Sequence, residues 1–188
     1  MNVETLPLKI TIHKLNLETP RLRIRKLIMN DVTAWMEYFQ SPQVLKFMGF
    51  KPDDKQGCII WIEKQLKRYA ANEHDGLRAL IDKETNEMVG QCGFLIQEID
   101  NEVVLEIGYH LISRFWKKGY ATEAAKAFKE YAFENNLADS LVSIIHIDNI
   151  NSQQVAERNG MKRERQTTFR DTAVFIYRID KQDWLKSF

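Results

Sequence analysis

A basic turn with a single glycine, followed by a predicted helix, is the segment of this chain best suited to bind an anion. The turn is Trp116-Lys117-Lys118-Gly119-Tyr120, and apolar residues recur at helical spacing after it. The first turn of a helix leaves its backbone N–H groups unpaired and carries partial positive charge. Gly119 would let the backbone approach a bound anion closely, and Lys117 and Lys118 add charge. The segment predicts a phosphate site, but an ordinary strand-to-helix turn with a solvated basic corner would look the same.

A second polar turn lies further along the chain, between a β-branched run and a short predicted helix. It contains Asn149 and Ser152, and the helix after it ends near Gly160. Serine is a preferred residue for capping a helix N-terminus, and glycine is preferred just after a helix ends. We therefore expect Ser152 to cap this helix and Gly160 to terminate it.

A carboxylate interrupts the most apolar predicted strand, which spans residues 103–112. This is Glu106, and a carboxylate that faces a cleft in such a strand would have a pKa raised by desolvation. Glu106 is thus the first candidate for a general base. The alternative is that it faces solvent or pairs with a basic side chain.

Alternating and helical patterns place these residues in a mixed order of strands and helices. We expect strands at 22–27, 78–82, 88–97, 103–112, 143–147, 162–166 and 173–179, with helices after Asp31, from 53 to 71, after Gly119 and from 152 to 159. A strand, helices, three strands, and then helices alternating with strands indicate an α/β protein.

Composition is compatible with one enzyme-sized domain. The chain has 188 residues, 44% of them hydrophobic, and a net charge of +1, which gives no field for binding nucleic acid or an anionic membrane. We expect a short leader over residues 1–17, a single domain over 18–188 and no membrane-spanning segment. Two cysteines, Cys58 and Cys92, and no signal peptide favour a cytoplasmic setting.

Three motifs in the right order resemble the GNAT family of N-acetyltransferases. Gly119 and Ala121 match its pyrophosphate loop, Asn149 and Ser152 match its second signature, and residues 18–25 resemble an opening strand. Trp116 and Lys117 depart from the usual loop in a way that resembles the RimJ/RimL-like group of ribosomal-protein acetyltransferases. The resemblance implies the acyl-CoA N-acyltransferase fold, with a central mixed, mostly antiparallel sheet of about seven strands flanked by helices.

The resemblance also implies how acetyl-CoA would be held. The Leu111 and Ile112 amides would lie near the pantetheine arm and the thioester, and Asn149 would bond the arm. The pyrophosphate would be held by the loop and the first helical turn, namely Lys117, Lys118, Gly119, Tyr120, Ala121 and the Thr122 hydroxyl.

Acetyl transfer to an amine needs a neutral amine and stabilisation of the oxyanion and the leaving thiolate. Glu106 is the expected base, with Asp171 and Glu164 in reserve, and Ser152 is the expected acid. Relatives often use a tyrosine as the acid, but here Ala156 stands at that position. His110 and His146 lack metal-ligand spacing, so no metal is expected.

The sequence therefore predicts an enzyme that moves an acetyl group from acetyl-CoA to a primary amine in a ternary complex. The acceptor would be a protein N-terminal amine, for example that of a ribosomal protein, or a small amine. The enzyme would be a monomer or a homodimer. The competing prediction is a non-catalytic CoA- or nucleotide-binding module.

Overall fold

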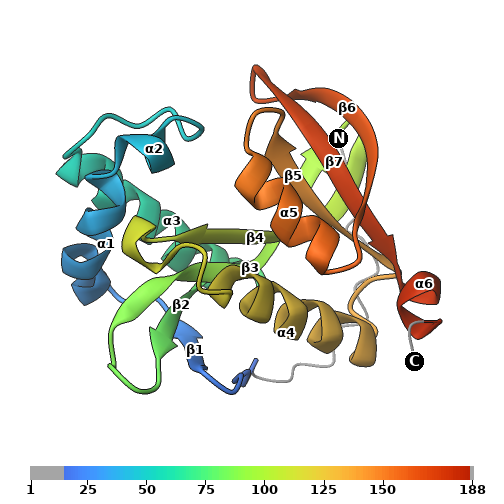
Figure 1. Cartoon of the computed structure of the whole chain (residues 1–188), viewed down its shortest axis with the longest axis horizontal. Coiled ribbons are helices and arrows are strands. Elements are labelled where there is room, and N and C mark those ends of the chain that lie inside the picture. The colour runs from blue at the N-terminus through green and yellow to red at the C-terminus, as the bar shows by residue number, and fades with distance from the viewer. Residues whose placement is uncertain (1–14, 187–188) are drawn as a thin grey trace.

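A seven-stranded mixed sheet forms the centre of the molecule in the computed structural model, which describes residues 15–186 (Figure 1). The strands are β1 (Leu22–Lys26), β2 (Gly76–Asp82), β3 (Met88–Ile99), β4 (Glu102–Leu111), β5 (Ser140–His146), β6 (Lys162–Phe169) and β7 (Thr172–Asp180). Their order is β1-β2-β3-β4-β5-β7-β6, and every pairing is antiparallel except that of β4 with β5. The expected sheet and fold are confirmed.

Helices cover both faces of this sheet. They are α1 (Val32–Phe39), α2 (Pro42–Leu45), α3 (Lys55–Ala71), α4 (Tyr120–Glu134), α5 (Ile150–Arg158) and α6 (Lys181–Leu185), with short 3₁₀ turns η1 (Met29–Asp31) and η2 (Ser113–Phe115). Phe128 of α4 packs edge-on against Phe94 of β3, with ring centroids 5.1 Å apart. Trp61 of α3 bonds the side chain of Gln91 on the same strand. Side chains alternate between the two faces of a sheet, and Gln91 and Phe94 are an odd number of residues apart, so α3 and α4 lie on opposite faces.

Turn chemistry explains where most elements begin and end. Asp54 caps α3 by accepting a bond from the Gly57 amide at 2.7 Å. Asp100 and Asn101, at φ 52° and 62°, form the tight turn between β3 and β4. Two consecutive left-handed residues suit the twist of a hairpin, and Asn and Asp tolerate that conformation.

Three local features add to what the sequence patterns predict. Asp31 directly precedes α1, but its carboxylate accepts bonds from the Ile28 amide and from Arg25 and does not cap the helix. Pro42 is the first residue of α2, a position where a proline lacking an N–H is tolerated. The short helix α6 was not predicted.

The predicted leader overlaps the fold. Leu15 is buried in the main core and Leu17 packs against it, so the last residues of the 1–17 segment contribute to packing. Residues 1–14 of that prediction lie outside the described residues. The two cysteines, Cys58 and Cys92, are buried and are not bridged.

Candidate active site

The candidate active site is a cavity of about 1420 Å³ at the point where the sheet splits. Strands β4 and β5 pair only at Glu106 and Val142 and separate beyond that pair (Figure 1). Ser143 spans the start of the gap, because its hydroxyl donates to the Ile107 carbonyl at 2.9 Å. The cavity follows both diverging strands and extends to the start of α4.

Backbone groups of β4 are left facing the gap. Antiparallel pairs alternate between hydrogen-bonded and non-bonded positions, and the Ile112 amide donates to the Val89 carbonyl at 3.1 Å. The alternation therefore directs the amides of Leu111 and Tyr109 toward β5. Leu111 lines the cavity, as expected for a cofactor-binding residue. Ile112 does not fit that role, because its amide is already bonded and its side chain is 1% exposed.

The basic turn contains two residues in the left-handed conformation. Lys117 and Gly119 have φ of 60° and 84°, and the helix begins at Tyr120 with Gly119 as its N-cap. This conformation is uncommon for lysine, so the backbone at Lys117 is strained. Trp116 packs against the main hydrophobic core and donates its indole N–H to the Leu111 carbonyl at 2.9 Å. It therefore ties the turn to the end of β4.

The first turn of α4 presents backbone amides into the cavity. Gly119, Tyr120, Ala121 and Thr122 all line the cavity, as does Lys117, whereas Lys118 does not. The Glu123 amide is the first to close a bond, to the Gly119 carbonyl at 3.0 Å. Amides before it have no partner within the helix, as at any helix N-terminus. The structure thus brings most of the predicted pyrophosphate residues together.

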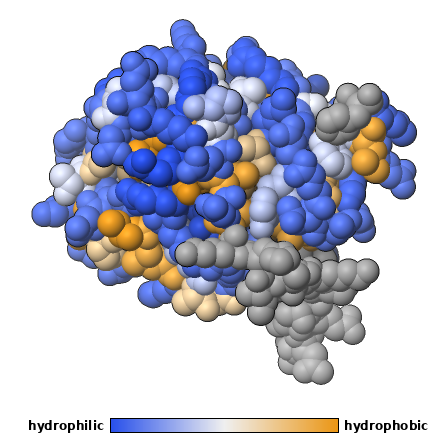
Figure 2. Space-filling model, turned by 90° about the horizontal axis from the view of Figure 1, so that it is seen from below, coloured by the Kyte–Doolittle hydropathy of each residue, from blue (hydrophilic) through white to orange (hydrophobic). Residues whose placement is uncertain are grey.

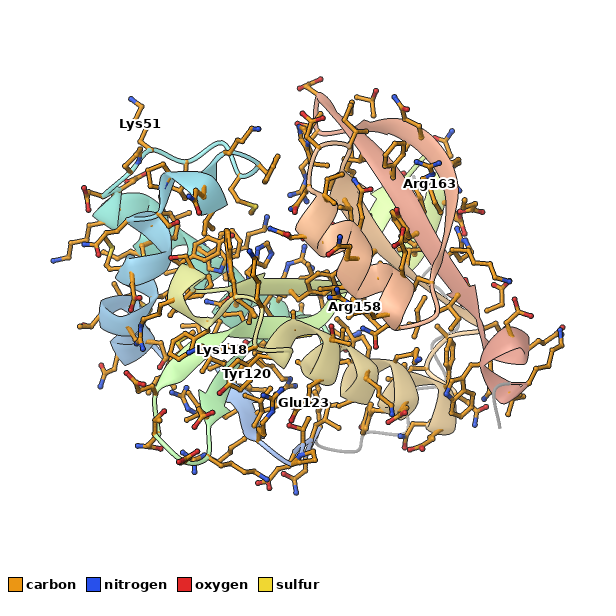
Figure 3. All side chains as sticks on the ribbon, viewed as in Figure 1. Lys51, Lys118, Tyr120, Glu123, Arg158 and Arg163 are labelled. Carbon is orange, nitrogen blue, oxygen red and sulfur yellow. The ribbon has the colours of Figure 1, made fainter. Side chains whose placement is uncertain are left out.

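Segment 19–21 supports this turn from behind. The Arg21 guanidinium bonds Glu123 and the Lys118 carbonyl, and Thr19 donates to Glu123 at 2.6 Å. Desolvation opposes ionisation of Glu123, but the bonds from Thr19 and Arg21 outweigh it and lower the pKa of that carboxyl. The Tyr120 hydroxyl donates to Asp82 at 2.6 Å. Figure 3 labels Lys118, Tyr120 and Glu123 close together at the start of α4.

The second polar turn caps α5 differently from the prediction. Asn149, and not Ser152, is the N-cap, and its side-chain oxygen accepts the Ser152 amide at 3.2 Å. Asparagine is as good a cap as serine, and the helix simply begins two residues earlier than expected. The Ser152 hydroxyl is thereby left for other work; within residues 15–186 it has no hydrogen-bond partner. Asn149 and Ser152 both line the cavity. As predicted, Gly160 terminates the helix, with a left-handed φ of 82° just after the end of α5.

Glu106 lies at the apex of the gap, where β4 and β5 meet. It lines the cavity, is only 8% exposed, and accepts a bond from the Gln97 amide at 2.8 Å. Burial raises the pKa of the Glu106 carboxyl, and the bonds from Gln97 and the Ile144 backbone offset this only in part. Arg170 donates to the other end of the Gln97 side chain at 3.3 Å. The carboxylate is therefore neither solvent-facing nor directly paired with a cation.

The two reserve bases lie outside the cavity. Asp171 is exposed at the tip of the β6–β7 turn, at φ 61°. Glu164 is exposed on the edge strand and pairs with Arg165 and Arg178. Neither lines the cavity, so neither fits the role of a base there.

Two tyrosine hydroxyls near α5 are bonded within the fold. The Tyr109 hydroxyl donates to the Ser152 carbonyl at 2.7 Å, which joins β4 to the start of α5. The Tyr177 hydroxyl donates to Glu157 at 3.2 Å. Ala156, at the position where relatives have a tyrosine, is buried. The Tyr109 and Tyr177 hydroxyls are thus both bonded within the fold, and Ser152 stays the candidate acid.

Sequence reasoning missed the wall opposite the cofactor turn. Tyr38 of α1 and His110 of β4 share a hydrogen bond of 2.9 Å, and both line the cavity. Burial lowers the pKa of His110 to about 4, so the ring is neutral at pH 7. Phe47, after α2, contacts His146 of β5, with ring centroids 4.9 Å apart and the ring planes tilted by 46°. No local pattern identifies these residues, because the tertiary fold decides which aromatic side chains face a cavity.

Two basic side chains at the cavity rim were also missed. Lys126 of α4 and Arg158 of α5 line the cavity, and Figure 3 places Arg158 beside α4. They come from separate helices, so no local motif contains both.

Figure 2 shows a mainly hydrophilic face with hydrophobic residues gathered near its centre.

Neither a metal centre nor a membrane span is found in the part of the chain that the structure describes. Residues 15–186 contain no group of three His, Cys, Asp or Glu side chains that could hold a metal ion. Within the same residues no helix is long and apolar enough to cross a membrane.

Comparison with known proteins places this architecture in a family. Residues 21–162 match the acetyltransferase (GNAT) domain. The chain belongs to the GNAT family of acetyltransferases, whose members use acetyl-CoA.

Individual relatives agree with this assignment. The uncharacterized protein YkkB of Bacillus subtilis is 34% identical over 151 residues, which cover 79% of this chain and 86% of YkkB. An acetyltransferase from Agrobacterium tumefaciens superposes with a TM-score of 0.75 at 29% identity, over 90% of this chain and 96% of that one. RimL, a ribosomal L7/L12 alpha-N-protein acetyltransferase solved with coenzyme A, has the same fold, with a TM-score of 0.66 at 18% identity over 86% and 95% of the two chains.

Proposed function

We propose that this protein transfers the acetyl group of acetyl-CoA to a primary amine by direct attack within a ternary complex. The observation that carries the proposal is the position of Glu106. A buried carboxylate lies at the apex of the same cavity whose other end is a turn of unpaired backbone amides. A module that only bound CoA would need the amides but not the buried carboxylate.

The residues of the cavity fit acetyl-CoA. Gly119 lines the cavity at φ 84°, a conformation that favours glycine, and a Cβ there would lie 3.3 Å from the Arg21 guanidinium. The amides of Lys118 to Thr122 suit a pyrophosphate, and Lys117 adds charge. Leu111 and Asn149 would bond the pantetheine arm. When bound, acetyl-CoA supplies an activated thioester.

Rim cations extend this cofactor site. Lys126 and Arg158 line the cavity beyond the helix N-terminus, where further phosphate charge of the cofactor would be exposed. Such exposed cations contribute modestly and in a salt-dependent way. We therefore assign them a steering role and leave most of the affinity to the oriented amides.

Glu106 acts in this proposal as the base that takes a proton from the acceptor ammonium. Its raised pKa brings the carboxylate closer to the pKa of an amine than an exposed glutamate would be. Gln97 holds one carboxylate oxygen and fixes its direction. The Ser152 hydroxyl is the proposed donor to the departing thiolate.

The acceptor would enter along the wall opposite the cofactor turn. This wall contains Tyr38, Phe47, Met48 and His110. Aromatic side chains and a neutral histidine favour an acceptor in which the group next to the amine is apolar or weakly charged. A protein N-terminus, including that of a ribosomal protein as in the case of RimL, and a small-molecule amine both remain candidates. We propose a cytoplasmic enzyme, active as a monomer or homodimer, that binds neither nucleic acid nor membrane. Its single domain, expected at 18–188, also includes Leu15 and Leu17, which pack in the core.

An amine panel tests the proposal. The full chain would be incubated with acetyl-CoA and either ribosomal-protein N-terminal peptides, polyamines or aminoglycosides, and CoA release would be followed. We expect release with at least one class of amine, at a rate that depends on Glu106. CoA binding with no release for any amine, and no difference between wild type and Glu106→Gln, would favour the non-catalytic module.

A further inference from the structure

The first turn of α4 contains a carboxylate that conflicts with an anion site. Glu123 follows Thr122 directly and lines the same cavity. Negative charge near a helix N-terminus stabilises the helix, but it repels an anionic ligand bound at that same end. Its side chain is only 18% exposed, so solvent screens the charge incompletely. An anion can bind at this helix end only if the negative charge of the Glu123 carboxylate is neutralised.

Arg21 neutralises that charge by pairing with the Glu123 carboxylate. Its Nε donates to Glu123 Oε2 at 2.6 Å, and its own backbone N–H donates to Oε1 at 3.0 Å. Thr19 adds a third donor to Oε1 at 2.6 Å. Both carboxylate oxygens are thus turned toward segment 19–21 and bonded there. Charge-assisted bonds of this kind are the stronger class of hydrogen bond.

The same guanidinium also fixes the direction of a loop peptide. Arg21 Nη1 donates to the Lys118 carbonyl at 2.9 Å. In a trans peptide the carbonyl and the following N–H point in opposite directions, and this structure has no cis bond within residues 15–186. Holding the Lys118 carbonyl toward Arg21 therefore turns the Gly119 N–H away from Arg21. The guanidinium also lies 4.5 Å from the centre of the Tyr120 ring, which keeps it under the turn.

We propose that Arg21 is a positioning residue of the cofactor site. It neutralises Glu123 and orients the Gly119 amide, so that the turn can accept a pyrophosphate before the cofactor arrives. This inference rests on the proposed function, because it requires that the pyrophosphate of CoA binds at this turn.

Charge-removing variants of both partners test the proposal, with CoA itself as the probe in calorimetric titrations of the full chain. Arg21→Gln exposes the cavity to the Glu123 charge and releases the Lys118 carbonyl, so CoA should bind about tenfold more weakly. Glu123→Gln keeps the bond from Arg21 to the Lys118 carbonyl, so CoA should bind as well as to wild type or more tightly. The double variant should bind more tightly than Arg21→Gln.

Two further measurements separate charge from structure. Raising the salt concentration should reduce the defect of Arg21→Gln, because repulsion is screened. Arg23→Gln is the matched control: Arg23 lies two residues further along the chain, on β1, bonds Asn86 and does not line the cavity. It should leave CoA affinity unchanged. Arg21→Lys, which keeps the charge, should bind CoA better than Arg21→Gln.

The outcomes are distinct from those of the proposed function. If wild type binds CoA but Arg21→Gln binds it equally well on folded protein, Arg21 has no positioning role. Equal losses in Arg21→Gln, Glu123→Gln and the double variant would indicate a purely structural ion pair and would also overturn the inference. If wild type itself fails to bind CoA, the proposed function fails first.

Discussion

The cofactor turn and the base lie in one cavity, but backbone atoms build the first and buried side chains build the second. At the turn, left-handed Lys117 and Gly119 direct amides toward a ligand, and the nearby cations are exposed. At the apex, Glu106 and Gln97 are buried and bond each other. Changes at the turn should therefore affect cofactor binding, whereas changes at the apex should affect turnover and its pH dependence.

The largest expected effect is on turnover at the apex. Glu106→Gln should lower the turnover number about 10²-fold or more, because the amide cannot take a proton, while acetyl-CoA affinity stays nearly unchanged. Steady-state rates with a responsive amine and calorimetric titration check both parts. Glu102→Gln is a matched control, since Glu102 lies on the same strand, is exposed and pairs with Arg178. Equal turnover in wild type and Glu106→Gln at every pH would remove Glu106 as the base.

The next effect is on binding at the turn. Gly119→Val should weaken acetyl-CoA binding about tenfold or more, because a β-branched residue is strained at φ 84° and its side chain would displace Arg21. Lys118→Ala should weaken it less, since an exposed lysine contributes little beside oriented amides. Dissociation constants at low and moderate salt decide the order. A larger loss in Lys118→Ala would make the turn an electrostatic patch rather than a backbone cradle.

A third change should move a pH profile more than a maximal rate. Gln97 donates to the Glu106 carboxylate and so stabilises its charged form, lowering a pKa that burial has raised. In Gln97→Leu that bond is lost and the pKa rises further. The rate increases with pH as Glu106 deprotonates, so this limb should shift to higher pH, which rate profiles would record. A shift to lower pH would contradict the assigned bond.

The smallest effect separates a helix cap from an acid. Asn149→Ala should lower the free energy of unfolding by about 1 kcal/mol, because it removes the cap of α5. Ser152→Ala should leave stability nearly unchanged and slow turnover. Thermal or denaturant unfolding together with rates tests the pair. If Ser152→Ala destabilises the protein as much as Asn149→Ala does, the corrected assignment of the cap is wrong.

Local patterns predicted the cofactor wall better than the acceptor wall, for a physical reason. A strand, a glycine turn and a helix N-terminus are consecutive in sequence, so residues 117–122 could be recognised together. The Tyr38–His110 pair joins residues 72 positions apart, and its exposure to the cavity depends on how β4 and β5 separate. The same holds for the partners of Glu106: Gln97 bonds it from β3, and Arg170, in the turn between β6 and β7, bonds Gln97.

The errors in prediction have equally local causes. The predicted cap was Ser152, whereas the structure has Asn149. Asparagine and serine are equally good caps, so residue type alone could not decide between them. Ile112 was grouped with Leu111, although adjacent amides of a strand point in opposite directions. Strand alternation decides which of the two can face a ligand only once the partner strand is known.

The most direct test is a calorimetric titration of the full chain with acetyl-CoA, ATP and NAD. In the proposed site a pyrophosphate lies on the amides after Gly119 and a pantetheine arm along Leu111 and Asn149, and of the three ligands only acetyl-CoA has both groups. We therefore predict that acetyl-CoA binds more tightly than either nucleotide and that Gly119→Val weakens this binding. Equal or tighter binding of ATP would contradict it.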